Sequence, residues 1–375
     1  MKIIGINCGG HDTSAALIIN GKLICAFEEE RFNKEKHTKK FPINSIKECL
    51  KFSKLKINDI SHIALSNDPK RLIRKFWLEG ALKNDYGLKK LIDEYKLIKE
   101  WHNLENFIKK KLGFNGVIKC YRHHLNHLSS CFYPSNFKKS LLISADGFGD
   151  FASTVAAVGD KNIISVKNKV LFPHSLGIFY QAFTQFLGFK NYGDEYKVMG
   201  LSAYGEDKFK NQLDKIITNN KNLFNLNLDF FQHHVKNINM KWNDESPKFE
   251  NLYNQNLSKL FNYNFESNPI EQIHMDLAKS VQSKFEEIIL TYIGFYKNKF
   301  DIENLSLSGG CAMNSLANGK IVKELKFKNI YIPPAPGDAG GAIGAAILCN
   351  KENYGSSKSY YDSPYLGNNL NKITL

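Results

Sequence analysis

Two histidines stand four residues apart in a stretch whose pattern predicts a helix. His123 and His127 lie in the segment HHLNHLSSCF. Residues i and i+4 of an α-helix share one face, so both imidazoles could bind one divalent metal ion. His124 points roughly 100° away from His123, which makes it the weaker ligand candidate and leaves its role open. Histidines at this spacing are also found as ordinary core residues, so the pair alone does not establish a metal site.

Two aspartates follow apolar runs and precede glycines. Asp146 ends the run LLISAD before GFGD, and Asp338 lies in PPAPGDAGGAIGAA. A carboxylate at the end of a strand lies at the mouth of the sheet and could bind a ligand there. Aspartate is also a common turn residue and helix N-cap, and the residues alone leave both readings open.

Two glycine-rich loops close successive strand–loop–helix units. Gly309 and Gly310 lie in SLSGGCAMN, with Asn314 one turn along, and Gly337 precedes Asp338 in the second loop. Such loops expose backbone N–H groups, and the helix after each loop presents further N–H groups to an anion. One Gly-Gly pair would mean little, but two loops of this kind predict a nucleotide at the floor of a cleft.

Three further polar residues lie near the N-terminus. His11 and Asp12 occur in GGHDTSA, and Lys36 occurs in RFNKEKH. Taken alone, they could equally be a hydrogen-bonded loop histidine, a turn aspartate and a solvated lysine.

The elements that must position these residues follow one plan twice. The first copy has strands at 2–7, 14–19 and 22–28, with Asn20-Gly21 as a two-residue hairpin turn. The second copy has strands at 139–145, 151–158 and 163–168, with Gly159-Asp160 at its hairpin. Identity between the halves is slight, so the predicted duplication rests on the order of the elements. That order is typical of the actin-like architecture, in which two sheets face each other across a cleft.

The remaining segments complete a two-lobed plan. We expect a first lobe over 1–134, a second lobe over 135–350 and a polar tail or linker over 351–375. Helices are expected at 42–55, in the Lys-rich stretch 68–111, at 123–132, after Pro173 and at 271–297. The Asn-, Lys- and Phe-rich segment 206–268 is expected to be an irregular helical insertion.

Composition excludes several classes of protein. Hydrophobic residues are 43% and charged residues 23% of the chain, which is typical of a soluble globular protein. There is no apolar run of about 18 residues and no leader pattern after Met1, so we expect a cytoplasmic location and no membrane partner. Seven scattered cysteines without a CxxC pair indicate no disulfide framework. The net charge of +14 is spread along the chain as lysine, so a nucleic-acid partner is not expected.

Six ordered motifs together resemble the NodU/CmcH-type O-carbamoyltransferases. They are GINCGGHDTSAALIINGKLICAFEEERFNKEKH, HHLNHLSSCFYPS, DGFGD, GDEYKVMGLSAYG, LSGGCAMNS and APGDAGGAIGAA. Only the segments near 85–115 and 206–270 match loosely. Members of this family resemble the tRNA threonylcarbamoyl-adenosine transferases, which have a duplicated, RNase H-like α/β fold of the actin type and a helix-borne His-x-x-x-His metal pair.

The resemblance implies roles for individual residues. It makes His123, His127, Asp146 and Asp338 ligands of a divalent metal, with iron expected and zinc as the alternative. It assigns Lys36, Asp146, Gly309, Gly310, Asn314 and Gly337 to the carbamoyl adenylate, and His11, Asp12 and Lys36 to catalysis.

The resemblance also implies a reaction. A carbamoyl group would pass from carbamoyl adenylate, made from carbamoyl phosphate and ATP, to a hydroxyl of a sugar-containing or secondary-metabolite acceptor. Family members carry a YrdC-type domain that makes the adenylate, and we expect it beyond Leu375 or on a separate protein. A homodimer is compatible with the family. The alternatives are a non-catalytic or tRNA-modification-type nucleotide-binding protein of the same fold, and a sugar kinase.

Overall fold

The computed structural model describes residues 1–68, 103–220, 223–236, 238, 240–242, 246–355 and 363–368. Within these residues, the first lobe is built on a sheet of five strands in the order β3-β2-β1-β4-β5. Strands β1, β2 and β3 form an antiparallel meander, and β4 and β5 run parallel to β1. The strands are β1 Lys2–Asn7, β2 Ser14–Ile19, β3 Lys22–Glu28, β4 His62–Leu65 and β5 Val117–Cys120.

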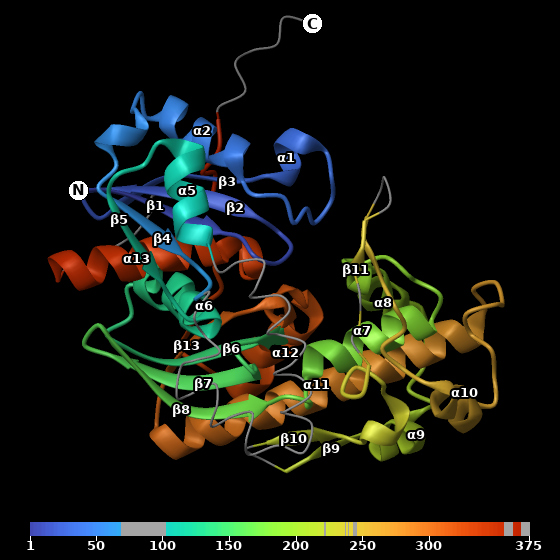
Figure 1. The fold of residues 1–375 in the computed structure, drawn as a ribbon. Coiled ribbons are helices and arrows are strands. Elements are labelled where there is room, and N and C mark those ends of the chain that lie inside the picture. The colour runs from blue at the N-terminus through green and yellow to red at the C-terminus, as the bar shows by residue number, and fades with distance from the viewer. Residues whose placement is uncertain are drawn as a thin grey trace, which may run out of the picture.

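The second lobe repeats this topology. Its sheet has the order β14-β13-β6-β7-β8, again with an antiparallel meander followed by two parallel strands. The strands are β6 Lys139–Gly149, β7 Ala152–Asp160, β8 Ile163–Leu171, β13 Asn304–Ser308 and β14 Asn329–Tyr331. The same strand order in both halves confirms the internal duplication and the actin-like, two-lobed α/β fold (Figure 1).

One of the two expected hairpin turns is confirmed and the other is wrong by two residues. Asn20 and Gly21 both have positive φ, 51° and 83°, as a type I′ turn requires. In the second lobe the positive-φ pair is Lys161 and Asn162, at 46° and 68°. Gly159 instead lies inside β7, where a Cβ would come 2.5 Å from the ring of Phe132. Glycine at this position therefore leaves room for the ring of Phe132 and is not part of the turn.

Two helices lie between the sheets and are exchanged between the lobes. Helix α6, His123–Phe132, follows the last strand of the first sheet but packs on β6 and β13 of the second. Helix α13, Gly341–Tyr354, follows the last strand of the second sheet but packs on β1, β2 and β4 of the first. The two helices also pack on each other (Figure 1).

Close backbone contacts hold α13 in this position. A Cβ at Gly344 would lie 2.1 Å from the carbonyl oxygen of Asn126 in α6, and a Cβ at Gly5 in β1 would lie 1.9 Å from that of Ala342. Both contacts need glycine. Apolar side chains from the two lobes surround this contact in a single buried cluster that includes Leu128, Phe132 and Ile347.

The other described helices are α1 Glu30–Asn33, α2 Ile43–Phe52, α5 Leu104–Leu112, α7 Leu176–Phe186, α8 Glu195–Leu201, α9 Lys210–Ile216, α10 Gln255–Phe261, α11 Gln272–Phe300 and α12 Ser315–Leu325. Among them, α2 packs on β2 and β3 of the first sheet, and α7 and α11 pack on β6 of the second. The helix expected at 271–297 is confirmed as α11, and its Leu277, Val281, Phe285 and Tyr292 are buried in the core of the second lobe. None of the described helices combines the length and apolar character that a membrane span requires.

The segment 206–268 is less helical than expected. Besides α9 and α10 it contains two short antiparallel pairs: β9 Ile217–Asn219 with β10 Phe224–Leu226, and β11 Met240–Lys241 with β12 Lys248–Phe249. Aromatic side chains of this segment, among them Phe224, Phe261 and Phe265, are buried in the core of the second lobe. Packing of these rings, which gives no regular period in the sequence, holds the short elements in place.

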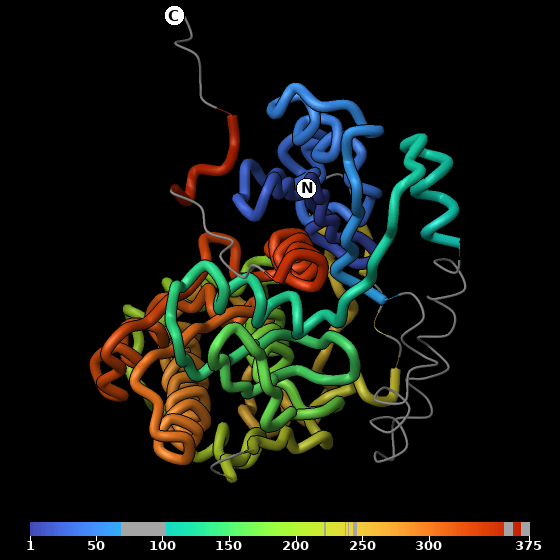
Figure 2. Tube along the Cα trace, turned by 90° about the vertical axis from the view of Figure 1, so that its left-hand side faces the viewer, coloured from blue at the N-terminus to red at the C-terminus, as the bar shows by residue number. Residues whose placement is uncertain are grey.

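Two expected segments lie partly outside the described residues. Most of the Lys-rich stretch 68–111 is outside them, and α5 is its described part. In the tail, residues 356–362 and 369–375 are outside. Residues 363–368 lie against the first lobe (Figure 2), where the carbonyl of Leu366 accepts a hydrogen bond of 3.1 Å from the backbone N–H of Ala26.

We predict that Gly344→Ala destabilises the protein, because its Cβ would clash with the backbone of α6. Overpacking of this kind costs about 1–3 kcal/mol. The matched control is Gly319→Ala, in the exposed part of α12, where a Cβ meets nothing within 4 Å. That change should be neutral or stabilising by up to about 1 kcal/mol, because alanine favours helix. Thermal unfolding of both variants measures the difference, and equal midpoints would contradict the packing role.

Candidate metal and nucleotide site

Four side chains from three separate elements converge between the lobes. His123 and His127 come from the first turns of α6, Asp146 from β6, and Asp338 from the loop that leads into α13. One ligand atom from each lies within 4.8 Å of all the others. The Nε2 atom of His127 is 2.9 Å from Oδ2 of Asp146, 3.4 Å from Oδ1 of Asp338 and 3.1 Å from Nε2 of His123. Two nitrogens and two carboxylate oxygens facing one point form a donor set that suits iron or zinc.

The charges of this cluster favour a cation at its centre. Burial lowers the pKa of His127, but the hydrogen bonds and charges of Asp146 and Asp338 raise it to about 10. Burial raises the pKa of Asp146, but hydrogen bonds from His123 and His127 hold it well below its usual range. The two carboxylates therefore keep positive charge on the imidazole of His127. A divalent cation could replace that proton.

The loop around Asp146 is shaped to admit the ring of His123. A Cβ at Gly149 would lie 2.0 Å from Cδ2 of His123, so only glycine lets the two approach. The carboxylate of Asp150 accepts a hydrogen bond of 2.6 Å from the backbone N–H of His123 at the start of α6. Two neighbouring residues of the DGFGD motif thus fix the first histidine.

His124 has a structural role. Its ring bonds the hydroxyl of Ser144 at 2.8 Å and the carbonyl oxygen of Ala152 at 3.0 Å. Burial, together with the charge of His123, lowers its pKa to about 3, so it is neutral. Both nitrogens are used within the fold, which settles the question that the sequence left open.

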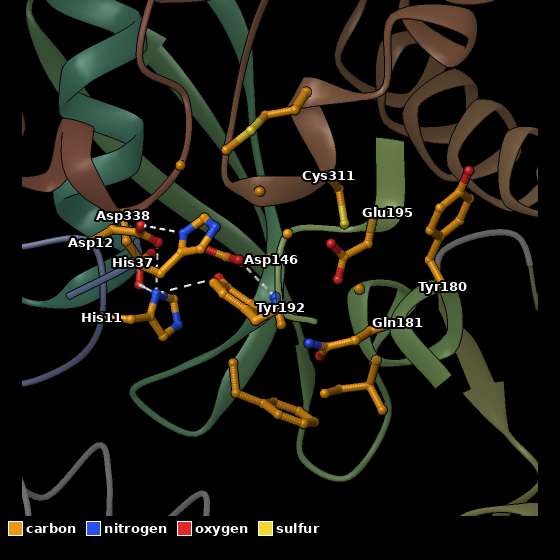
Figure 3. A pocket seen from close by; sticks show the side chains of 18 of the residues that line it. His11, Asp12, His37, Asp146, Tyr180, Gln181, Tyr192, Glu195, Cys311 and Asp338 are labelled. Atoms are coloured by element: carbon orange, nitrogen blue, oxygen red, sulfur yellow. Dashed lines mark hydrogen bonds and ion pairs between the residues drawn. The ribbon is translucent and has the colours of Figure 1, made fainter. Parts of the chain in front are cut away.

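The cluster of four metal-ligand candidates borders a large cavity between the lobes. The cavity has a volume of about 810 Å³ and is lined by both aspartates, by His11, Asp12 and Lys36, and by Gly310, Asn314 and Gly337. Figure 3 shows His11, Asp12, His37 and the two aspartates at one side, and Glu195, Gln181, Tyr180 and Cys311 at the other. Lys36 is exposed, at the solvent edge of the cavity.

The two glycine loops meet each other at the cavity. The backbone N–H of Gly309 donates a hydrogen bond of 2.8 Å to the carbonyl of Pro336. Gly309 has a φ of 87°, and a Cβ there would lie 2.1 Å from the carbonyl oxygen of Ala145. Gly310 faces the carboxylate of Asp146, since a Cβ at Gly310 would be 3.1 Å from Oδ1.

Two of the expected nucleotide residues are engaged in the fold. Gly309 is not among the residues that line the cavity, and its N–H is bonded to Pro336. The side-chain oxygen of Asn314 accepts from the N–H of Ala317 at the start of α12, and its amide bonds Gln282. Asn314, Gly310 and Gly337 line the cavity, and the contact of all four residues with a nucleotide stays a prediction.

Sequence reasoning missed several residues of the cavity wall. Glu195 and Tyr192 both come from the stretch NYGDEYKVMG, and His37 directly follows Lys36. Burial raises the pKa of Glu195. Burial and the charge of Asp12 raise the pKa of Tyr192 well above its usual value. The only signal for them was that their segments carry family motifs, since no chemical spacing marks them.

His11 and Asp12 form a pair beside the four metal-ligand candidates. Nδ1 of His11 is 2.7 Å from Oδ2 of Asp12 and 3.7 Å from Oδ2 of Asp338. Burial lowers the pKa of His11, but the hydrogen bond with Asp12 and the charges of Asp338 and Asp12 raise it to about 9. The structure thus brings the predicted catalytic histidine within reach of the predicted metal ligands.

Comparison with known proteins identifies related chains. A family model described as "Carbamoyltransferase N-terminus" matches residues 2–347. The nodulation protein NolNO of Sinorhizobium fredii is 31% identical over 347 residues, which cover 91% of this chain and 46% of that protein. An uncharacterized protein of Synechocystis is 34% identical over 359 residues, covering 92% of this chain and 56% of that protein. The chain spans about half the length of these relatives.

Two solved structures are similar at low identity. Full-length HypF in a phosphate- and nucleotide-bound form is 13% identical, with a TM-score of 0.44, and covers 96% of this chain and 56% of its own. The activator of 2-hydroxyisocaproyl-CoA dehydratase from Clostridium difficile, with bound ADPNP, is 12% identical with a TM-score of 0.48, covering 97% of this chain and 99% of its own.

We predict that His127→Ala lowers the affinity for Fe²⁺ and Zn²⁺ by at least about 100-fold, because the change removes one of the four ligand side chains. Metal content after dialysis and the metal-induced rise in melting temperature measure this. His11→Ala is the control, since His11 is not one of the four converging side chains. Retained metal in the His127 variant would count against the ligand set.

Gly149→Ala tests the geometry without removing a ligand. The new methyl group would push the ring of His123 away, so metal affinity should fall by about tenfold, one ligand being misplaced. Gly147→Ala in the same loop is the matched control, because a Cβ there meets nothing within 4 Å. Equal metal affinity of the two variants, measured by competition with a chelator, would show that the close contact does not matter.

Proposed function

Because the chain belongs to the carbamoyltransferase family, we propose that it transfers a carbamoyl group from carbamoyl adenylate to a hydroxyl of a sugar-containing or secondary-metabolite acceptor. One observation above all supports this assignment. The four converging ligand residues and the His11–Asp12 pair border the same cavity, which also has glycine-rich loops in its wall. A single cavity thus contains candidates for charge stabilisation, proton transfer and phosphate binding.

The chemistry needs both partners to be activated. A carbamoyl carbonyl is a poor electrophile because its nitrogen donates electrons into it, and a hydroxyl is a poor nucleophile at neutral pH. Adenylation supplies AMP as a good leaving group. A divalent ion, iron being our expectation, would supply positive charge to the carbonyl or phosphate oxygens and would offset the carboxylate charges that raise the pKa of His11.

His11 is placed to handle the proton of the acceptor. Its Nδ1–H donates to the carboxylate of Asp12, which leaves Nε2 on the other edge of the ring. In the neutral ring that nitrogen carries a lone pair and can accept the hydroxyl proton as the oxygen attacks. Asp12 fixes the tautomer. Burial raises the pKa of Asp12, but the hydrogen bonds from His11 and His37 hold it below its usual value, so the carboxylate stays ionised.

The glycine loops and the far side of the cavity together suit a nucleotide. Backbone N–H groups near Gly310 and Gly337 can bind phosphate oxygens, and Lys36 at the cavity edge adds a positive charge. Glu195 lies at the other side of the cavity from Asp12, as Figure 3 shows, where a carboxyl group can bond the hydroxyls of a ribose. The acceptor would then enter beside His11.

The activation step belongs to another unit in this proposal. A YrdC-type domain, beyond Leu375 or on a separate protein, would make carbamoyl adenylate from carbamoyl phosphate and ATP. Both are metabolites of the cytoplasm, so we expect the reaction there. The oligomeric state consistent with the family is a homodimer.

We predict that His11→Ala keeps the metal but slows transfer by about 10²–10⁴-fold, the usual contribution of a general base. The assay supplies synthetic carbamoyl adenylate and a panel of sugars, and measures AMP and carbamoylated product. His127→Ala should lose metal and transfer together, and Gly319→Ala should match the wild type.

Two outcomes would redirect the assignment. Wild-type protein that is loaded with metal but releases no AMP with any acceptor would contradict transferase activity. ADP formed from ATP and a sugar would instead identify a kinase.

A further inference from the structure

The carboxylate of Asp12 lies between two histidines. Its Oδ2 is 2.7 Å from Nδ1 of His11, and its Oδ1 is 2.7 Å from Nδ1 of His37. An ionised carboxylate only accepts hydrogen bonds, so both imidazoles donate their Nδ1–H to it. Each oxygen of Asp12 is thereby used by one ring, and the bond from His37 limits the ways in which Asp12 can turn.

His37 lines the cavity, but its second ring nitrogen is packed against protein. Its Nε2 edge faces Gly193, where a Cβ would come 2.5 Å from that nitrogen. Its backbone N–H donates to Oε2 of Glu30 at 2.8 Å, and its carbonyl accepts from the indole N–H of Trp242 at 3.2 Å. These contacts fix the orientation of His37, so that its Nδ1–H donates to Asp12 and its Nε2 lies against the backbone of Gly193. It is not placed to act on a substrate.

Tyr192 adds a contact from the second lobe. Its ring centroid is 4.5 Å from that of His11 and 4.8 Å from that of His37. Its hydroxyl oxygen is 3.3 Å from Nδ1 of His11. The Nδ1–H group that His11 donates to Asp12 can therefore form a bifurcated hydrogen bond, with Tyr192 as the second, more distant acceptor. Figure 3 shows Tyr192 beside both first-lobe histidines. Phe249 of the insertion packs on the other side of Tyr192, with centroids 5.5 Å apart.

We propose that His37 is a positioning residue for the His11–Asp12 pair, and that Tyr192 completes this arrangement from the second lobe. The proposal rests on the proposed function, because it gives His11 the proton transfer. His37 acts through Asp12 on the orientation and tautomer of His11. Tyr192 makes that orientation depend on contact between the lobes, so the base is aligned only when the cavity is closed on this side.

A double-mutant cycle separates this role from general structural support. AMP release from supplied carbamoyl adenylate is measured with metal-loaded wild type, His37→Leu, His11→Ala and the double variant. Because His37 acts through His11, His37→Leu should lower kcat by about tenfold in the wild-type background, and by less than about twofold once His11 is absent. KM for carbamoyl adenylate should change by less than about twofold. Losses that multiply in the double variant would overturn the proposal.

Conservative variants sharpen the result. His37→Asn keeps an N–H donor near the position of Nδ1 and should restore most of the kcat lost in His37→Leu. Tyr192→Phe keeps the ring but lacks the hydroxyl, and should lower kcat less than Tyr192→Leu does. The matched control is His62→Leu, in the same lobe on β4 and outside the cavity lining, which should behave like the wild type. A kcat of His37→Leu that matches this control would also overturn the proposal.

A readout that needs no turnover tests the same point. In zinc-loaded protein labelled with ¹⁵N at histidine, the Nδ1–H signal of His11 is assigned by its loss in His11→Ala. It should shift or broaden in His37→Leu and persist in His37→Asn, whereas an unchanged signal in His37→Leu would refute the positioning role. If the wild type releases no AMP, the proposed function fails, and this signal still decides whether His37 orients His11.

Discussion

The arrangement of the site depends on the contact between α6 and α13. These helices meet where Gly344 of α13 lies against the carbonyl of Asn126 in α6, with room for a hydrogen atom but not for a methyl group. The hydroxyl of Ser129 in α6 also donates to the carbonyl of Gly344 at 3.1 Å. Because each helix packs on the sheet of the other lobe, this single contact joins the two halves of the duplicated fold. It also brings the start of α6 close to the loop before α13, which places His123 and His127 opposite Asp338.

Charge concentrates where these elements meet. Asp146, Asp338 and Asp12 lie close together in a poorly solvated cavity, which is costly unless positive charge is nearby. Two histidines with raised pKa supply it: His127 faces Asp146 and Asp338, and His11 faces Asp12 and Asp338. The same closeness connects the two parts of the site. A cation among the metal-ligand candidates would change the electrostatic surroundings of His11, so in the proposed reaction charge stabilisation and proton transfer would be coupled through Asp338.

Both lobes contribute to each function of the cavity. His11, Asp12 and His37 come from the first lobe, whereas Tyr192, Asp146 and Asp338 come from the second. The hydroxyl of Ser14 in β2 donates to the carbonyl of Ala339 at 2.7 Å, so the loop of Asp338 is tied directly to the first sheet. A change in the angle between the lobes would therefore alter both the metal-ligand candidates and the surroundings of the base. This gives a physical reason why one closed cavity, and not two separate sites, would carry the chemistry.

The sequence by itself determined the local elements and their repetition. All three strands of the first meander have the predicted bounds, because short apolar runs and the Asn20-Gly21 turn are local properties. The helix of His123 and His127 was predicted for the same reason, since spacing along one helix needs no tertiary information. The site residues that carry family motifs were also found, although the sequence alone could not place them together.

Only the tertiary structure decided which of these residues meet and what each one does. Gly159 looked like a turn residue but makes room for Phe132, whereas Gly309 and Asn314, predicted to contact a nucleotide, also form hydrogen bonds within the fold. His37 and Tyr192 had no chemical signature in the sequence, because their importance comes from partners that are 25 and 181 residues away along the chain. The metal-ligand candidates converge through the exchange of α6 and α13 between the lobes, which depends on the packing of whole sheets and cannot be read from any local pattern.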